Sequence, residues 1–368
     1  MSDPGDAAVA LTSELVAIDS VNPSLVPGAA GEPRIVDHLW TRLEAAGFAV
    51  TIVDADGDPA RPSLVAVGPG DPRRPAVLLN GHLDTVGVSG MTDPFTPRID
   101  GGRLYGRGAA DMKAGLASIV VAAEALAADS GVRPVLALVA DEEDASRGSE
   151  AVIAALPSLD VHPEVCLIAE PTDLALARSL RGFAVVEVAF IGRAAHSSQR
   201  ELGVDAIAHL GRFLATIEQR APAVRAAGGE LMVTQVRGGE SPFLVADHAE
   251  CLVELRTTPG ETAAAAADAV RALVPPGADV RVRLVAHREA WQLDSAGPAA
   301  ELAALLGDEL GTAATFDAPY WMEAPLWQQI APTVICGPSG GGLHSVDEWV
   351  DLGQVRRFTR AVIEVLAT

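Results

Sequence analysis

The sequence predicts an α/β protein with a mostly parallel sheet and, inserted in the same chain, a separate α+β domain. Short apolar runs rich in branched residues alternate with helical patterns through residues 7–169, which is typical of a parallel sheet covered on both faces. Residues 183–286 follow the order βαββαβ, which is typical of a ferredoxin-like fold. The 368 residues, of which 49% are hydrophobic, are enough for two domains with sizeable cores.

The first domain begins with two helical patterns, and Gly47 suits the position that follows the second helix. A loop rich in proline, glycine, aspartate and arginine, residues 68–75, separates the early strands from the central strand. The predicted elements are helices 7–18 and 32–46, strands 48–53, 63–67 and 75–79, a turn and short strand over 100–105, a helix ending near 128, and strands 132–140, 164–169 and 332–336.

The second domain is predicted to start near Arg178 and to interrupt the first domain. Its predicted elements are strand 183–190, helix 205–219, strands 231–236 and 250–256, helix 262–273 and strand 279–286. We therefore expect one domain to be formed by residues 1–177 and 289–368 and the inserted domain by residues 178–288.

Charge and composition exclude some classes of partner. The net charge is −22, from 27 basic and 49 acidic residues, and such a surface repels the phosphate backbone of nucleic acids. No run of about 18 apolar residues is free of charges or turn residues, so we expect no membrane span. The acidic N-terminal segment has no secretory pattern, and the cysteines at 166, 251 and 336 are typical of buried free thiols in a reducing compartment. We expect a cytoplasmic protein.

The stretch that best indicates chemistry is 80–86, Asn-Gly-His-Leu-Asp-Thr-Val, which follows a predicted buried strand. We expect the chain to turn at Gly81 and to present His82 and Asp84 on the same side. A metal-binding histidine needs an acceptor for its second ring nitrogen, usually a carboxylate, and Asp84 can supply one. Alone, this spacing is also typical of a turn with a solvated aspartate.

Other acidic and imidazole side chains follow predicted strands in the same way. They are Asp111, Glu142, Glu143, Glu170 and His344, the last at the end of a glycine-rich loop. Sites in open α/β sheets form at the carboxyl ends of strands, so we expect these residues to meet there. Their carboxylates would repel one another unless a cation lay among them. The glycine-rich segments lack the spacing of dinucleotide-binding and P-loop motifs, so nucleotide binding is not expected.

These motifs resemble those of the M20 family of co-catalytic zinc metallopeptidases and deacylases, which includes acetylornithine deacetylase and succinyl-diaminopimelate desuccinylase. The resemblance covers nearly the whole chain, and six motifs occur in the family's order. They are Gly-His-Leu-Asp-Thr-Val at 81–86, Gly-Arg-Gly to Asp-Met-Lys at 106–113, Asp-Glu-Glu at 141–143, Glu-Pro-Thr at 170–172, Gly-Arg-Ala-Ala-His-Ser at 192–197, and the segment 337–348.

The resemblance implies a zinc-peptidase-like catalytic domain with two zinc ions per chain, for which cobalt or manganese could substitute. The implied ligands are His82 and Glu170 for one zinc, Glu143 and His344 for the other, and Asp111 as the bridge between them. Glu142 matches the general base, and Asp84 matches the carboxylate that orients His82. A cis peptide bond between Asp111 and Met112 is also implied. Zinc takes nitrogen and oxygen ligands and lowers the pKa of bound water to about 7, which suits hydrolysis.

For the inserted domain, the resemblance implies a lid that is also the surface of a homodimer. His196 would reach the active site of the neighbouring subunit and stabilise an oxyanion there. Arg256 would bind a carboxylate of the substrate, for which a planar guanidinium is well suited.

The chain departs from the family pattern at a few positions. Phe243 and Ala246 stand where asparagine and proline are common, Ser339 where glycine is usual, and Glu323 where many relatives have aspartate. Two interpretations of the bulky residues Phe243, Trp321 and Met322 stay open: they shape an apolar pocket for the substrate, or they belong to the core.

We therefore expect a dizinc amidohydrolase that removes the acyl group from a small N-acyl amino acid, in the manner of acetylornithine deacetylase. A dipeptidase or carboxypeptidase of the same family is the alternative within this class. A non-catalytic, metal-stabilised binding protein is a distinct alternative, but it would have no need for a general base such as Glu142.

Overall fold

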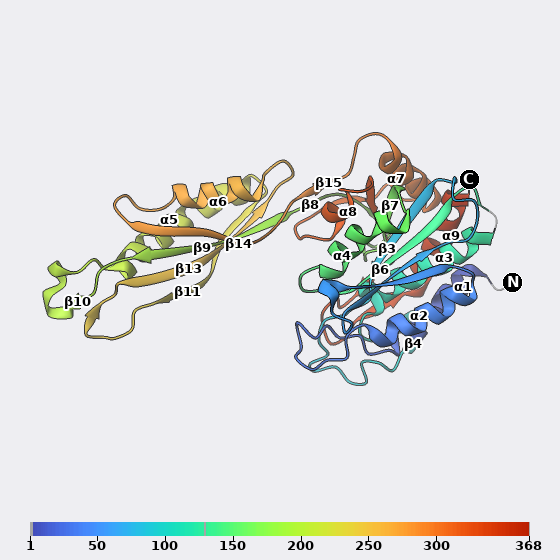
Figure 1. Cartoon of the computed structure of the whole chain (residues 1–368), viewed down its shortest axis with the longest axis horizontal. Coiled ribbons are helices and arrows are strands. Elements are labelled where there is room, and N and C mark those ends of the chain that lie inside the picture. The colour runs from blue at the N-terminus through green and yellow to red at the C-terminus, as the bar shows by residue number, and fades with distance from the viewer. Residues whose placement is uncertain (1–2, 129, 368) are drawn as a thin grey trace. The chain divides into compact units, whose positions relative to one another are not determined.

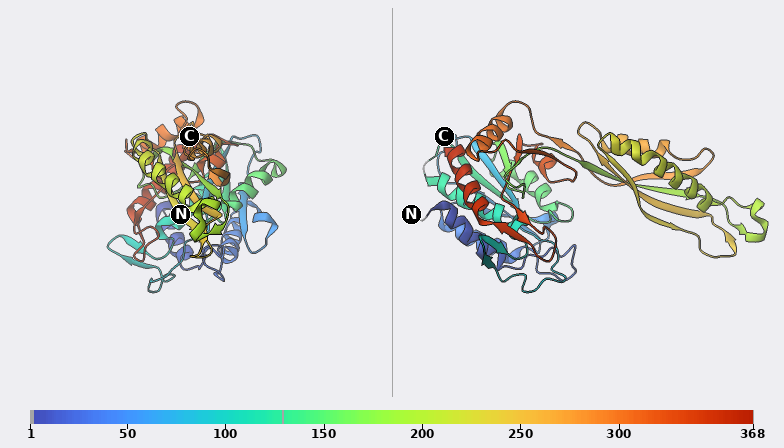
Figure 2. Two further views of the ribbon diagram at one scale, coloured as in Figure 1. Left: turned by 90° about the vertical axis from the view of Figure 1, so that its left-hand side faces the viewer. Right: turned by 180° about the vertical axis from the view of Figure 1, so that it is seen from behind.

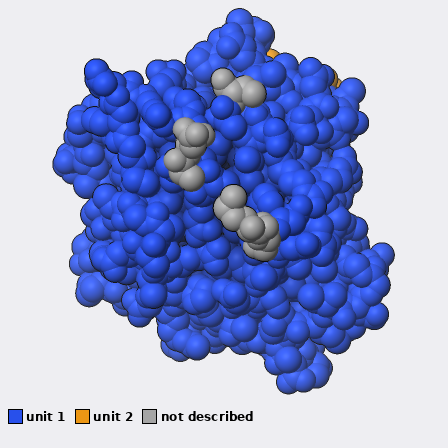
Figure 3. Space-filling model, turned by 90° about the vertical axis from the view of Figure 1, so that its right-hand side faces the viewer, with its two compact units in different colours: residues 1–177, 293–316, 326–368 blue, residues 178–292, 317–325 orange. Residues whose placement is uncertain are grey.

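The computed structural model describes residues 3–128 and 130–367. The chain divides into two compact units, each of which is considered by itself. Unit 1 consists of Met1–Ala177, Leu293–Phe316 and Leu326–Thr368, and unit 2 consists of Arg178–Gln292 and Asp317–Pro325. Figure 3 shows one face of unit 1 in blue. Residues 289–292 and 317–325 go with unit 2, although we expected 289–368 to belong to the first domain. Within unit 2 the hydroxyl of Ser179 donates to Asp317 at 2.8 Å.

Unit 1 is built on a six-stranded sheet in the order β1-β2-β6-β3-β7-β17. The strands β6, β3, β7 and β17 are parallel, and β2 and β1 are antiparallel additions at one edge, so the expected mostly parallel sheet is confirmed. Every residue of β3 is buried, as expected for a strand covered on both faces. The bounds are β1 Ala49–Asp54, β2 Pro62–Val67, β3 Ala76–His82, β6 Arg133–Val139, β7 Pro163–Ile168 and β17 Thr333–Ile335.

Helices cover both faces of this sheet (Figures 1 and 2). On one face α1, α3 and α9 pack against one another and share a core with Val77 and Leu79 of β3. On the other face α4 packs on β1, β2 and β6, and its buried Val152 lies outside that core. The helices of unit 1 are α1 Pro4–Val16, α2 Pro33–Ala45, α3 Ala114–Ala128, α4 Arg147–Ala155, α7 Pro298–Glu309 and α9 Leu352–Ala367.

A second sheet brings the C-terminal loop beside the segment that precedes Asp111. Its order is β18-β19-β5-β4, and Trp349 of β19 pairs with Tyr105 of β5. Its strands are β4 Arg98–Asp100, β5 Arg103–Tyr105, β18 Gly340–Gly341 and β19 Trp349–Asp351. The remaining elements outside unit 2's main sheet are β8 Leu176–Leu180, β15 Trp291–Gln292, β16 Thr315–Ala318, α8 Ala324–Trp327, and short helical turns at Ala55–Gly57, Ala109–Lys113 and Leu156–Leu159.

Unit 2 has the βαββαβ order expected from the sequence. Its antiparallel sheet has the order β11-β13-β9-β14, and Phe213 of α5 and Val270 of α6 pack on its buried face. The elements are β9 Gly182–Ile191, α5 Ala206–Ala226, β11 Glu230–Gly238, β13 His248–Thr257, α6 Ala263–Ala272 and β14 Asp279–Arg288, with β10 Ala195–His196 and β12 Leu244–Val245 paired and a turn at Ser197–Leu202. The helix α5 continues through Pro222, beyond its predicted end at 219.

The state of the cysteines agrees with the sequence analysis. Cys166, Cys251 and Cys336 are buried and free. Among the described helices, none combines the length and the apolar character needed to cross a bilayer.

Candidate active site

Parallel strands deliver the predicted site residues to one edge of the sheet of unit 1. β3 ends at His82, which lies in register with Val139 at the end of β6, and Glu142 and Glu143 follow β6 directly. Glu170 follows β7 in the same way. The carboxyl ends of neighbouring parallel strands meet at the same edge, which explains how residues far apart in sequence converge.

The expected turn at Gly81 is wrong, because β3 continues through Gly81 to His82. The absence of a side chain at Gly81 instead leaves room for Met112. A Cβ atom on Gly81 would lie only 2.9 Å from Cε, at the flexible end of the Met112 side chain. The peptide bond between Asp111 and Met112 is cis, as the resemblance implied.

Asp111 lies between the two histidines. Its Oδ1 is 3.0 Å from Nε2 of His82, and its Oδ2 is 3.2 Å from Nε2 of His344. Nε2 of His344 is also 3.1 Å from Oε2 of Glu143. Ligand atoms around a tetrahedral zinc ion lie ~3.3 Å from one another, given zinc–ligand distances of ~2.0 Å. The spacing of these side chains is therefore close to that of a metal centre.

The donor set fits zinc. Ligand atoms of His82, Asp111 and Glu143 lie within 4.8 Å of one another, and so do those of His82, Glu142 and Glu170. The Oε1 atom of Glu143 is buried and has no hydrogen-bond partner within residues 3–128 and 130–367. A buried carboxylate oxygen is costly without a partner, and a cation among these ligands would supply one.

The pKa values in this cluster are displaced from their ordinary values. Hydrogen bonds to Asp111 and Glu143 raise the pKa of His344 to about 10. Burial opposes a charge on His82, but the carboxylates of Asp111 and Asp84 outweigh it and raise the pKa of His82. Burial likewise opposes ionisation of Asp111, but hydrogen bonds from His344 and His82 outweigh it and lower the pKa of Asp111. Protons and metal ions therefore compete for the same ligand atoms.

Asp84 contacts two parts of the site, His82 and the turn that follows β6, and the second contact was not predicted from the sequence. Nδ1 of His82 is 3.0 Å from the main-chain oxygen of Asp84 and 3.6 Å from its carboxylate, so the main-chain oxygen, not the expected carboxylate, is the nearer acceptor. The carboxylate instead accepts the main-chain N–H groups of Glu142 (3.1 Å) and Glu143 (3.2 Å). The carboxylate of Asp84 therefore lies near His82 and also holds the turn that carries Glu142 and Glu143.

Glu348 is a second residue whose role the sequence did not show, although it ends the last family motif. It is buried, and it accepts the main-chain N–H groups of Gly108, Ala110 and Asp111 at 3.0–3.1 Å. Its Oε2 also accepts from Nη1 of Arg107 at 2.6 Å. Glu348 therefore fixes the segment that presents Asp111 and ties it to the loop that carries His344.

The two remaining predicted residues lie in unit 2, at opposite ends of its sheet. Arg256 pairs in register with Phe183 near the start of β9, whereas His196 lies on β10, beyond Ile191 at the other end of β9 (Figure 1). A strand rises ~3.3 Å per residue, so the eight steps from Phe183 to Ile191 span ~26 Å.

The surroundings of these two side chains differ. His196 is exposed, and its Nδ1 accepts the main-chain N–H of Ser198 at 3.2 Å. Arg256 is half-buried, and its Nε lies 2.8 Å from a carboxylate oxygen of Glu254. Its guanidinium also lies over the ring of Phe183, with its central carbon 5.6 Å from the ring centroid.

The three bulky residues Phe243, Trp321 and Met322 do not form one cluster in unit 2. Phe243 is 69% exposed, and its main-chain oxygen accepts from Ser197 near His196. Trp321 packs edge-on against Phe183, at the other end of the sheet, and Met322 is buried. Of the remaining departures, Ala246, Ser339 and Glu323 are all buried.

A protein-family profile and several relatives match most of the chain. The profile of peptidase family M20/M25/M40 matches residues 78–368. Acetylornithine deacetylase from Proteus mirabilis is 26% identical over 368 residues, which cover 94% of this chain and 92% of the relative. Acetylornithine deacetylase from Myxococcus xanthus is 32% identical over 276 residues, which cover 71% and 70%.

Solved structures show the same fold. Aminopeptidase PepT from Bacillus cereus has a TM-score of 0.81 at 20% identity and covers 99% of this chain and 98% of its own. A dinuclear metal-binding peptidase of the M20 family from Bacillus subtilis has a TM-score of 0.72 at 16% identity, with 99% and 98% covered. The match of the family profile to most of the chain shows that it belongs to peptidase family M20/M25/M40 and is a metal-dependent hydrolase of amide bonds.

Proposed function

We propose that this protein is a dizinc amidohydrolase that removes the acyl group from an N-acyl amino acid. The observation that carries the proposal is the position of Asp111, whose two oxygens face different histidines at 3.0 and 3.2 Å. A carboxylate placed in this way suits a bridge between two metal ions. His82 and Glu170 would complete one site, and Glu143 and His344 the other.

The proposed chemistry assigns different tasks to two adjacent carboxylates. Zinc, when bound, would polarise the amide carbonyl and lower the pKa of a water molecule. Glu142 would take a proton from the attacking water and deliver it to the nitrogen of the leaving amine. Asp84 holds the main-chain N–H of Glu142 at 3.1 Å and so keeps the base beside the ligands. Glu143 would stay with the metal.

The proposed substrate class rests on the relatives and on Arg256. Relatives that cover most of the chain are named acetylornithine deacetylase, a name that describes removal of an acetyl group from an acetylated amino acid. Such a substrate keeps a free carboxylate. The side chain of Arg256 is 33% exposed, and its guanidinium, paired with Glu254, could exchange that partner for the carboxylate of the substrate.

We further propose that His196 acts in a neighbouring subunit of a homodimer formed through unit 2. The distance within unit 2 supports this arrangement. Arg256 and His196 are separated by a strand length of ~26 Å, which exceeds the length of a small N-acyl amino acid. One rigid unit 2 cannot place both side chains on the same substrate molecule, whereas two copies can. The buried free cysteines suit the reducing conditions of the cytoplasm, which is the location we propose.

A dipeptidase or carboxypeptidase activity is the alternative, because solved structures with the same fold include a carnosine dipeptidase and a metallo-carboxypeptidase. The test is to remove metal with a chelator, restore zinc or cobalt, and assay N-acetyl amino acids beside dipeptides. We expect restored activity that is highest on the N-acetyl amino acids. Higher kcat/KM on dipeptides would favour the alternative, and full activity without metal would contradict both.

A further inference from the structure

The turn that carries Glu142 and Glu143 is held from behind by a buried polar network. Asp84 is fully buried, and its two carboxylate oxygens each accept one main-chain N–H group of this turn. The preceding residue, Asp141, is also fully buried and has a φ of 68°, in the left-handed region. The orientation of these two aspartates therefore sets the direction in which the turn presents its side chains.

Asn22 joins the two aspartates. Its side-chain amide is fully buried, and its Nδ2 donates to Oδ2 of Asp84 at 2.7 Å and to Oδ1 of Asp141 at 3.1 Å. Its main-chain N–H donates to the oxygen of Thr85 at 2.9 Å, which fixes the amide relative to the strand end. The NH2 group of Asn22 thus contacts both carboxylates, and Arg147 donates to the other oxygen of Asp141 at 2.7 Å.

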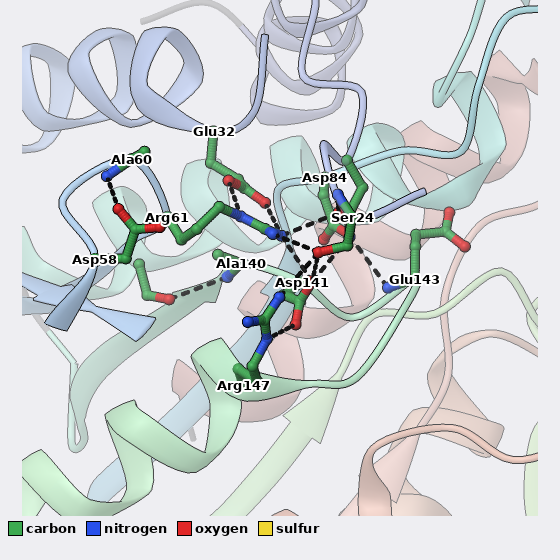
Figure 4. Close-up of polar contacts among 12 residues, drawn as sticks. Ser24, Glu32, Asp58, Ala60, Arg61, Asp84, Ala140, Asp141, Glu143 and Arg147 are labelled. Atoms are coloured by element: carbon green, nitrogen blue, oxygen red, sulfur yellow. Dashed lines mark hydrogen bonds and ion pairs between the residues drawn. The ribbon is translucent and has the colours of Figure 1, made fainter. Parts of the chain in front are cut away.

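Arg61 also belongs to this network, and Figure 4 shows its guanidinium in contact with Glu32 and Asp141. Its Nη2 donates to Asp141 at 2.7 Å and to Oδ1 of Asn22 at 3.2 Å. Two parallel hydrogen bonds of 3.0 Å connect its guanidinium to Glu32. The acceptor oxygen of Asn22 therefore accepts from Arg61 and from the main-chain N–H of Ser24 (2.8 Å), which leaves its NH2 group facing the two aspartates.

We propose that Asn22 and Arg61 are positioning residues that fix the carboxylate of Asp84 and, through it, the turn that carries Glu142 and Glu143. Both residues precede position 78, where the match to the family profile begins. They touch none of the predicted metal ligands through their side chains, and the proposed mechanism gives them no task. The inference rests on the proposed roles of Glu142 and Glu143.

The proposal predicts an effect on metal binding that needs no substrate. Replacing Asn22 by alanine leaves Oδ2 of Asp84 without its 2.7 Å donor, so the carboxylate can rotate and release the N–H of Glu143. Residues that orient metal ligands typically contribute 10–100-fold to metal affinity or activity. We expect Asn22→Ala to weaken the binding of zinc by about 10–100-fold and to lower kcat at saturating zinc by a similar factor.

The experiment compares Asn22→Ala, Arg61→Lys and the control Arg42→Lys. Arg42 makes an equivalent pair of hydrogen bonds, 2.6 and 2.8 Å, to Glu124 in the same unit, but it lies outside the network. In both Arg61→Lys and Arg42→Lys, lysine keeps the positive charge but lacks the planar guanidinium that forms two parallel hydrogen bonds. Zinc affinity is measured on metal-free protein by competition with a chromogenic chelator, beside the unfolding midpoint and kcat.

We expect weaker zinc binding in Asn22→Ala and Arg61→Lys, and wild-type zinc affinity in Arg42→Lys even where it lowers the unfolding midpoint. Wild-type zinc affinity and kcat in folded Asn22→Ala would overturn the proposal. If Asn22→Ala does not fold, wild-type zinc affinity and kcat in Arg61→Lys would overturn it instead. A wild type that hydrolyses no amide in the panel, combined with weaker zinc binding in both variants, would reject the proposed function and leave the positioning roles standing.

Discussion

Replacement of Glu348 by glutamine should cost ~3–5 kcal/mol in the free energy of unfolding. The side chains of Glu348 and Arg107 are 1% and 3% exposed and lie 2.6 Å apart, and breaking a buried pair of this kind typically costs ~3–5 kcal/mol. Burial raises the pKa of Glu348, so the charge of Glu348 is not itself favoured by folding. In the wild type, the guanidinium of Arg107 and three main-chain N–H groups share the two carboxylate oxygens of Glu348. The cost arises because the amide of glutamine has only one acceptor oxygen for the same donors.

The assay is a urea titration of Glu348→Gln followed by tryptophan fluorescence, with Asp100→Asn as the matched control. Asp100 pairs with Arg98 at 3.3 Å, but both side chains are largely exposed, so its loss should cost less than ~1 kcal/mol. Zinc affinity should also fall in Glu348→Gln, because the same carboxylate holds the N–H of Asp111. An unfolding free energy within 1 kcal/mol of wild type, no different from Asp100→Asn, would refute this reasoning.

Three further outcomes are expected. In zinc-free protein, the stability advantage of wild type over His344→Asn should be complete below pH 6.5 and should vanish as the pH rises to about 10, because a raised histidine pKa favours the folded state only while the group is protonated. The assay must compare the unfolding free energy of wild type with that of His344→Asn, because Lys113, whose pKa burial lowers to about 7, makes the stability of both proteins rise with pH over that range. A stability advantage of wild type that grows with pH would contradict the assignment. Mixing His196→Ala with Glu142→Ala should restore activity, since one site of the mixed dimer has both residues, and no recovery despite confirmed subunit exchange would exclude action in the neighbouring subunit. Arg256→Ala should lower kcat/KM on N-acyl amino acids by about 30-fold or more and change hydrolysis of the matching amides little; equal loss on both would exclude a carboxylate-binding role.

The fold could be predicted from the sequence wherever one local pattern determines the structure. The uninterrupted apolar run of β3 indicated a strand buried on both faces, and the alternation of strands and helices indicated a parallel sheet. The C-terminal helix α9 was not among the predicted elements, although Val355, Phe358 and Val362 recur at the spacing of one helix face and are buried. The extension of α5 through Pro222 also went unpredicted, because proline ordinarily ends a helix.

The same distinction applies to the candidate site, where local sequence patterns predict some features and not others. Residues at strand ends, such as His82 and Glu170, could be located because a parallel sheet brings strand ends together. The contacts of Glu348 could not be predicted from the sequence, because its hydrogen-bond partners lie 237–241 residues away. Some of these partners are main-chain N–H groups, which every residue except proline has and which therefore carry no sequence signal. The preference of His82 for the main-chain oxygen of Asp84 depends on a difference between 3.0 and 3.6 Å, which spacing in sequence cannot resolve.

The central claim, that Glu142 moves the proton while Glu143 binds metal, is tested most directly by measuring zinc content and kcat together in Glu142→Gln and Glu143→Gln. The account predicts that Glu142→Gln retains close to the zinc content of wild type and loses kcat by at least ~10²-fold, the usual contribution of a general base. Glu143→Gln should instead lose zinc from one site. A fully zinc-loaded Glu142→Gln protein with the kcat of wild type would contradict the account.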